Sequence, residues 1–223
     1  MTKKHLDLKK RLQNIGKMKT NKNNMNYKKK VTILKITKQI VINNGWSNNI
    51  LKQLLKKGIE ESDLILFFEN DYKELLKFSL SELNKSLSDE IKKINIINFP
   101  TNKRIKKILM FRMKILNDDI KFYKKTFNHL LLPQNANIMK KSLYNAVDEM
   151  WYLAGDNSTD FNFYTKRAIL SGIYVNALFV LFNKDFKQVE INIDKNLKKI
   201  SKIPKFKERF SFIKDNIPVI LKG

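Results

Sequence analysis

The sequence has no cysteine, and this absence excludes several kinds of site. There can be no disulfide bond, no thiolate metal ligand and no cysteine nucleophile. Histidine is almost as scarce, because only His5 and His129 occur, far apart and in unrelated contexts. Their spacing matches no metal-binding motif, so we expect neither a metal site nor a cofactor.

Glycine and proline are also rare, with 6 and 4 residues in a chain of 223. A many-stranded sheet needs more turn-forming residues than this, whereas leucine, isoleucine, lysine and asparagine recur at helical spacing along most of the chain. The length favours one domain with appendages. We therefore predict an all-α fold.

Acidic residues are few in relation to basic ones, and the formal net charge is +24. Residues 1–30 contain eleven lysines and arginines against a single aspartate. Residues 1–29 have few large apolar side chains, so we predict a basic, disordered arm; neither a secretory signal nor a typical mitochondrial leader is supported. The charge suggests a polyanionic partner, although an AT-rich genome would produce the same lysine and asparagine bias.

The region of about residues 30–80 has the layout of a three-helix head. One helical pattern stops at residues 43–45, a second ends at Gly58, and residues 58–76 contain a short helix, a turn and the start of a longer helix. This arrangement resembles the DNA-reading head of the tetracycline-repressor family. A lipid-responsive transcriptional regulator is therefore an alternative function.

The charge of this head argues against DNA binding. Residues 60–74 contain six acidic residues and one lysine, and affinity for duplex DNA depends largely on basic residues that neutralise phosphates. The apolar run at residues 64–68 also offers little hydrogen bonding to base edges. We expect a degenerate helix-turn-helix that does not bind an operator.

Residues 100–186 form the second part of the predicted domain. A helical pattern runs through residues 105–116, and a later one ends at Gly155 with Trp151 on its buried stripe. The apolar run at 168–182 is shorter than the roughly 20 residues of a membrane span. It predicts a buried helix that lines a core, a dimer interface or a lipid cavity.

The carboxylates around this helix boundary do not form a catalytic set. Asp148, Glu149, Asp156 and Asp160 lie close in sequence, but no histidine, nucleophile elbow or glycine-rich phosphate loop accompanies them. We predict that the chain is not an enzyme and has no catalytic residue.

The stretch MWYLAGDNSTDFNFYTKRAILSGIY at residues 150–174 resembles the signature of the Coq-nine family of ubiquinone-biosynthesis proteins, WYLAGDxSTDFNWYTKRAxLAxVY. The resemblance covers about residues 30–186. It implies a tetracycline-repressor-like fold, a homodimer, an isoprenoid, quinone or phospholipid ligand in an internal cavity, and no chemistry by the chain itself. Such proteins assist the demethoxyubiquinone hydroxylase by presenting its lipid substrate.

The resemblance also implies positions for two sites. The family's hydroxylase contact maps onto Asp160, Phe163 and Tyr164, with Arg167 adjacent. Phe163 replaces the family's usual tryptophan, which keeps an aromatic face but loses an N–H donor. The lipid cavity is assigned to apolar residues of three helical segments: Met113, Leu116, Met150, Trp151, Leu170 and Tyr174.

The C-terminal part of the chain predicts contact with a membrane. Residues 187–204 form a lysine-rich connector, and residues 205–223 have an amphipathic helical pattern that Pro218 ends or kinks. The apolar face of this segment, with core packing as the alternative, consists of Phe206, Phe210, Ile213 and Ile217. The predicted location is the cytoplasmic face of a bacterial inner membrane or the matrix face of the mitochondrial inner membrane.

Overall fold

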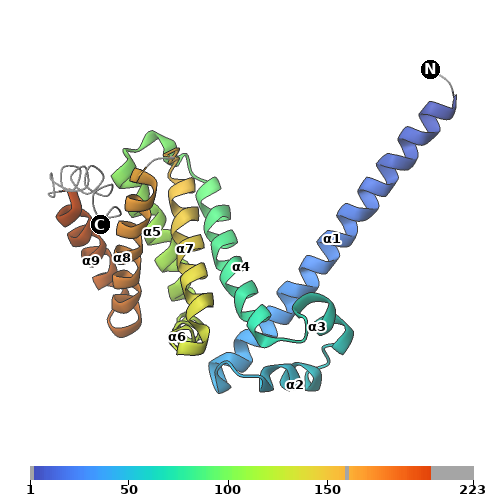
Figure 1. Cartoon of the computed structure of the whole chain (residues 1–223), viewed down its shortest axis with the longest axis horizontal. Coiled ribbons are helices and arrows are strands. Elements are labelled where there is room, and N and C mark those ends of the chain that lie inside the picture. The colour runs from blue at the N-terminus through green and yellow to red at the C-terminus, as the bar shows by residue number, and fades with distance from the viewer. Residues whose placement is uncertain (1–2, 159–160, 202–223) are drawn as a thin grey trace, which may run out of the picture. The chain divides into compact units, whose positions relative to one another are not determined.

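The computed structural model describes the backbone of residues 3–158 and 161–201, and the side chains of residues 23–158 and 163–199. Within those ranges the chain consists of α-helices and two short 3-10 helices, without strands (Figure 1). The predicted all-α fold is confirmed. The finer resemblance to the tetracycline repressors stays a prediction.

The chain divides into two compact units. Unit 1 comprises residues 1–81 and 121–138, and unit 2 comprises residues 82–120 and 139–223. Unit 1 includes the head predicted at about residues 30–80, and unit 2 includes most of the second part predicted at about 100–186; the domain bounds stay predictions. Unit 1 differs in also including a later segment of the chain, residues 121–138.

Unit 1 is built from the following elements: α1 (Lys3–Asn44), α2 (Asn49–Lys56), α3 (Glu61–Phe68), the start of α4 (Tyr72–Lys92), α6 (Ile120–Leu130) and the 3-10 helix η2 (Pro133–Asn135). Trp46, which follows Gly45 at the end of α1, explains why α6 belongs here. Its indole N–H donates to Thr126 Oγ1 at 3.0 Å, and its ring centroid lies 6.0 Å from that of Phe122. A buried tryptophan with a satisfied N–H is a stable anchor between distant segments.

Carboxylates and apolar side chains of helix α3 are exposed to solvent. Ile65 and Leu66 are 55% and 68% exposed, and Glu61 and Glu69 are exposed one turn before and after Ile65. No basic side chain lies on this helix. The outward face of α3 therefore has the wrong charge to bind phosphates, as the sequence predicted.

Unit 2 contains the end of α4, the 3-10 helix η1 (Ile96–Asn98), α5 (Thr101–Asp118), most of α7 (Ala136–Leu153), α8 (Phe161–Asn183) and α9 (Phe186–Ser201). Helix α8 packs against α9 and α5, and the three lie side by side in Figure 1. Lys106 of α5 joins α9 through Glu190 and Asp194, at 3.0 and 2.8 Å.

Two segments are more helical than the sequence predicted. The expected disordered arm at 1–29 lies largely within α1, which begins at Lys3, and the expected connector at 187–204 is mostly α9. In α9 the signal was the pair Val189 and Ile193, which are one turn apart and fully buried. Lysine-rich sequence around such a short apolar stripe is compatible with helix, because lysine is itself a good helix former.

Helix α8 is longer than the apolar run that predicted it. Residues Phe163–Asn183 have the length and mean hydropathy, 1.3, of a helix that could cross a membrane, the one such helix in the described part of the chain. Buried positions nevertheless recur along one side of it, at Leu170, Tyr174, Ala177 and Leu181. This periodicity is that of a core helix with one outward face.

Candidate functional site

The site lies where α7 ends and α8 begins, within unit 2. Helix α7 stops at a left-handed glycine: Gly155 has φ +78°, its N–H donates to Tyr152 O, and the N–H of Asp156 donates to Trp151 O at 3.0 Å. These two hydrogen bonds form a Schellman cap, which needs the left-handed conformation that glycine adopts without strain. The cap turns the chain so that Asp156 follows directly under the start of α8.

Arg104 of α5 holds the same turn from outside the signature. Its guanidinium donates to three backbone carbonyls, those of Phe99, Ala154 and Ile97, at 2.5, 2.9 and 2.7 Å. A Cβ added at Gly155 would lie 3.2 Å from Arg104 Nη1, a tight contact that would require the guanidinium to shift. Arg104 could not be identified from the sequence, since a lysine-rich helix gives no sign of which cation binds carbonyls.

Asp156 is the centre of a buried polar cluster. Its side chain is 5% exposed and accepts hydrogen bonds from Lys166 Nζ at 2.6 Å, Ser158 Oγ at 2.8 Å and Arg167 Nη1 at 3.3 Å. Burial alone would raise the pKa of Asp156, but the hydrogen bonds from Lys166, Ser158 and Arg167 together hold that pKa below its ordinary value. The carboxylate is therefore a fixed anion.

Arg167 connects this anion to the aromatic residues of α8. Its Nε donates to Asp148 Oδ1 of α7 at 2.7 Å, and its Cζ lies 3.2 Å from the ring centroid of Phe163. The residue is only 7% exposed. A guanidinium that is buried, paired with two carboxylates and stacked on an aromatic ring fixes the geometry of the helix start.

Tyr164, in the first turns of α8, is exposed to solvent. It is 67% exposed, and its ring contacts that of Phe163 edge-on with centroids 5.1 Å apart. Phe163 itself is half-buried under Arg167. The Phe163 ring is therefore held by contacts within the cluster, whereas the Tyr164 ring faces solvent.

Trp151 belongs to the same corner. It is half-buried, its indole N–H donates to Lys166 O at 3.1 Å, and Lys166 Nζ lies 5.5 Å from its ring centroid. Trp151 was predicted to be a core residue, but only part of its ring is buried. Trp151 also ties the last turn of α7 to the first turns of α8.

The predicted contact residues have different surroundings. Tyr164 is exposed, Phe163 is half-buried, and Arg167 is internal, with its guanidinium occupied by Asp148 and Asp156. Asp160 lies outside the described residues, as does the predicted membrane-binding set Phe206, Phe210, Ile213 and Ile217. The direct contact expected of Arg167 is not available in this structure, because a buried and doubly paired guanidinium cannot reach a partner.

The predicted lipid-cavity residues come together in the core of unit 2. They lie on α5 (Met113, Leu116), α7 (Met150, Trp151) and α8 (Leu170, Tyr174), and all except Trp151 are at most 1% exposed. Arg112 of α5 is buried with them, donating to Tyr174 Oη and to Asn84 Oδ1 of α4 at 2.8 Å each. The core that was predicted to be apolar therefore contains the cation of Arg112.

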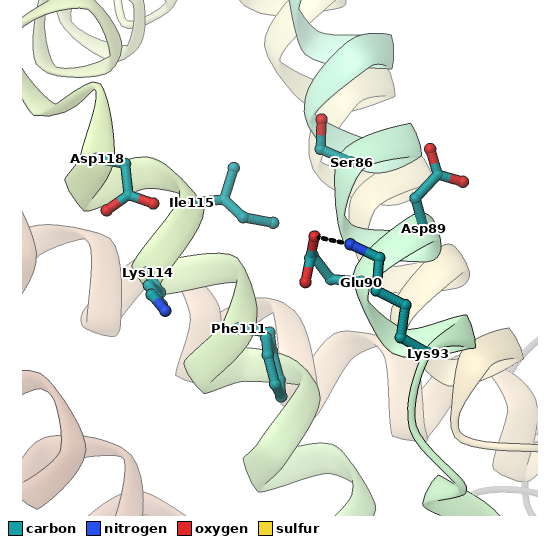
Figure 2. A pocket seen from close by; sticks show the side chains of 8 residues that line it. All are labelled: Ser86, Asp89, Glu90, Lys93, Phe111, Lys114, Ile115 and Asp118. Carbon is teal, nitrogen blue, oxygen red and sulfur yellow. Dashed lines mark hydrogen bonds and ion pairs between the residues drawn. The ribbon is translucent and has the colours of Figure 1, made fainter.

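Two grooves flank α5 and share Phe111. The first, of about 460 Å³, lies between α4 and α5, where charged side chains surround Phe111 and Ile115 (Figure 2). The second, of about 560 Å³, is lined by Phe99, Met110 and lysines of α5. Neither groove is lined by a residue assigned to the lipid cavity.

Comparison with known proteins finds matches that include this site. The COQ9 family model matches residues 136–204, from the start of α7 to beyond α9. Curated relatives include "Ubiquinone biosynthesis protein COQ9, mitochondrial" of Bos taurus, 31% identical over 67% of this chain and 49% of the relative, and of Homo sapiens, 28% identical over 67% and 49%. "Probable ubiquinone biosynthesis protein coq9, mitochondrial" of Dictyostelium discoideum is 25% identical over 68% and 52%. The chain thus spans about half the length of the curated relatives that it matches.

Proposed function

We propose that the chain belongs to the COQ9 family and acts in ubiquinone biosynthesis as a non-enzymatic accessory protein. In this role it binds an isoprenoid or quinone lipid and presents it to the demethoxyubiquinone hydroxylase. Support comes from the extent of the family match, which contains the polar cluster at Asp156, the exposed Tyr164 and the whole of α8. The names of the curated relatives support a mitochondrial location. The matrix face of the inner membrane is part of our proposal.

The observation that carries the proposal is Tyr164, an exposed aromatic on a rigid base. Hot spots of protein interfaces are enriched in tyrosine, tryptophan and arginine, and rigid aromatic anchors lose little conformational entropy on binding. Phe163 and Arg167 lie directly behind Tyr164 and are already ordered by contacts within the chain. We therefore assign Tyr164 as the direct contact and Phe163 with Arg167 as its support.

The lipid site and the membrane contact are two further parts of the proposed function. We place the lipid tail in the apolar core between α5, α7 and α8, where Met113, Leu116, Met150, Leu170 and Tyr174 are buried. Residues 205–223, outside the described part, contact the membrane through their amphipathic pattern. A lipid carrier needs both, since polyprenyl lipids are too apolar to cross water unaided.

We also propose a homodimer through the outward face of α8. Exposed small and apolar residues recur there at helical spacing: Ala168, Gly172, Val175 and Phe179. Phe179 is the largest of them and is 72% exposed. Phe179→Glu is expected to convert the dimer to a monomer in light scattering, whereas a wild-type chain that is already monomeric contradicts this part of the proposal.

A pull-down with the hydroxylase tests the docking assignment. Tyr164→Ala is expected to reduce recovery of the hydroxylase, because it removes the presented ring without touching the buried cluster. Tyr144→Ala is the matched control, since Tyr144 is also an exposed tyrosine but lies on α7, two turns before Tyr152. Equal recovery with both variants would show that the contact lies elsewhere.

A further inference from the structure

The turn that joins α6 to η2 in unit 1 carries two leucines that the fold leaves in solvent. Leu131 is 70% exposed and Leu132 is 40% exposed, directly before the exposed Pro133. Single exposed apolar side chains are common on protein surfaces, but adjacent leucines at the tip of a turn form a continuous apolar surface. Packing within the described part of the chain does not account for this surface.

Hydrogen bonds hold the two leucines in this position. The N–H of Leu131 donates to Phe127 O at 3.2 Å, which continues the helical turn of α6, and the N–H of Asn135 donates to Leu132 O at 2.9 Å. The side chain of Asn135, which is buried, also donates to His129 O at 2.8 Å. The apolar tip is therefore a fixed part of unit 1, and little conformational entropy is lost when it is covered.

The outer face of α6 next to this tip is basic. The exposed lysines of this face are Lys121, Lys124 and Lys125. Residues 120–138 contain no aspartate or glutamate. The face continues through Asn128, which is exposed and lies one turn before Leu131 and Leu132. Cationic and apolar side chains therefore follow one another along the same side of this segment.

Helix α3 of the same unit shows the opposite combination. Leu66 is 68% exposed, almost as much as Leu131, but Glu61 and Glu69 are exposed near it and no basic side chain lies on the helix. The negative surface potential of an anionic bilayer attracts lysine side chains and repels carboxylates. Of these two surfaces, the tip of α6 has the charge that fits an anionic lipid surface.

The composition of the tip fits a lipid surface better than a protein interface. The cores of protein interfaces are depleted in lysine and enriched in aromatic residues, and leucine is under-represented among hot spots. The aromatic residues Phe122 and Tyr123 of α6 are buried, so the tip exposes leucine and lysine instead. A fluid bilayer accepts this pair of residue types, because leucine enters the acyl boundary while lysine stays at the level of the headgroups.

We propose that Leu131 and Leu132 insert into the interface of an anionic lipid bilayer, with the lysines of α6 against the lipid phosphates. The inference rests on the membrane location proposed above and adds a second contact to the one assigned to residues 205–223. Two leucines alone give weak and reversible binding. The tip therefore acts together with residues 205–223 as one of two linked anchors, whose combined affinity exceeds that of either.

Flotation of the full chain with vesicles tests this surface. The probes are vesicles of phosphatidylcholine with and without phosphatidylglycerol, and we expect the wild type to bind the anionic vesicles at lower lipid concentration. Leu131→Glu combined with Leu132→Glu is expected to raise the anionic lipid concentration needed for half-maximal binding at least about tenfold, because two apolar groups are lost and two anions are added. Leu66→Glu on α3 is the matched control and is expected to float like the wild type.

A tryptophan reporter tests whether residue 131 enters the bilayer. Leu131→Trp and Leu66→Trp are each mixed with phosphatidylglycerol vesicles whose acyl chains carry bromine, which quenches tryptophan fluorescence at short range. We expect Leu131→Trp to be quenched more than the wild type, which has two tryptophans of its own, and Leu66→Trp to be quenched no more than the wild type. A purely structural role of Leu131 would not produce this difference.

Wild-type flotation of the double glutamate variant, or quenching of Leu131→Trp no greater than that of the wild type, overturns the anchor on α6 and leaves the contact of residues 205–223 in place. A wild type that floats with neither vesicle overturns the membrane part of the proposed function as well. If the double variant changes the mass of the lipid-free chain in light scattering and floats like the wild type, the tip is a contact between copies and the anchor is overturned. If the double variant does not fold, Leu131→Gln combined with Leu132→Gln replaces it: weaker flotation is expected, and full affinity contradicts the proposal.

Discussion

Two surfaces of this chain present apolar side chains to solvent, and they are built differently. On α3 the exposed Ile65 and Leu66 lie between carboxylates and have no buried polar cluster behind them. At the start of α8 the exposed Tyr164 rests on Phe163, which in turn lies against Arg167. The comparison teaches that exposure alone does not make a docking site; a surface ring that internal ion pairs hold in place is the better candidate.

The largest expected change in stability comes from removing the ion pairs next to the two surfaces, at Asp156 near the start of α8 and at Asp63 of α3. Asp156→Asn removes a carboxylate from between two cations, one of them nearly buried, and we expect a loss of about 3 kcal/mol in the free energy of unfolding of unit 2. Asp63→Asn breaks the pair between this residue of α3 and Lys29, whose side chain is half exposed, and should cost much less. Urea unfolding checks both. Equal losses would mean that the Asp156 cluster is no more than a surface network.

The next effect concerns left-handed glycines at two helix ends. Gly155→Ala combines strain at φ +78° with a Cβ that crowds Arg104, so we expect a loss of about 2 kcal/mol. At Gly58, after α2, φ is +83° and the added Cβ meets nothing within 4 Å, so Gly58→Ala should lose only about 1 kcal/mol. Thermal unfolding of the two variants measures the difference. A larger loss of stability in Gly58→Ala than in Gly155→Ala would contradict the proposed crowding between residue 155 and Arg104.

Part of this site could be predicted from the sequence because it depends on local signals. Gly155 ends α7 as expected, and the aromatic and charged residues after it do begin a helix. The burial of Arg167 could not be read in the same way, since it depends on Asp148, 19 residues earlier and on another helix. For Arg112 the sequence shows its place on the apolar stripe of α5, but not its partners, which lie 28 and 62 residues away.

The same reasoning explains the fold-level differences. The helix ends near residues 44, 58 and 155 were predicted, because glycine follows each of them. In contrast, α9 was taken for a connector because lysine and asparagine conceal its short stripe at Val189 and Ile193. Inclusion of α6 in unit 1 depends on the Trp46 hydrogen bond to Thr126, a contact across 80 residues. Local patterns specify helices, but they do not specify which helices share a core.

Acid should weaken the two units in different pH ranges. In unit 1, burial and then the charge of Lys73 lower the pKa of His129, so its contribution to stability is lost as pH falls below the unfolded-state value of about 6.5. In unit 2 the lowered pKa of Asp156 keeps its contribution until pH falls below about 3.9 and toward the folded-state pKa. His129→Gln should therefore flatten the stability profile between pH 5 and 7, roughly, while Asp156→Asn changes only the more acidic range. If Asp156→Asn, and not His129→Gln, removed the pH dependence of stability between about pH 5 and 7, the two pH ranges would be wrongly assigned to these residues.

The smallest effect is expected from trimming the two exposed surfaces themselves. Tyr164→Ala and Leu66→Ala should each change the free energy of unfolding by less than about 0.5 kcal/mol, because neither side chain is buried. Urea unfolding of both variants beside the wild type is the measurement. If Tyr164→Ala lost more than about 2 kcal/mol in the free energy of unfolding, the ring would contribute to packing within the fold and would not be free to bind a partner.

Hydrogen exchange of the full chain with and without the hydroxylase tests the docking claim most directly, because it reports on both surfaces in one experiment. We predict that adding the hydroxylase slows amide exchange in the peptides around residues 150–170 and leaves those of α3 at residues 61–69 unchanged. Slower exchange confined to residues 61–69, with none around Tyr164, would contradict the account.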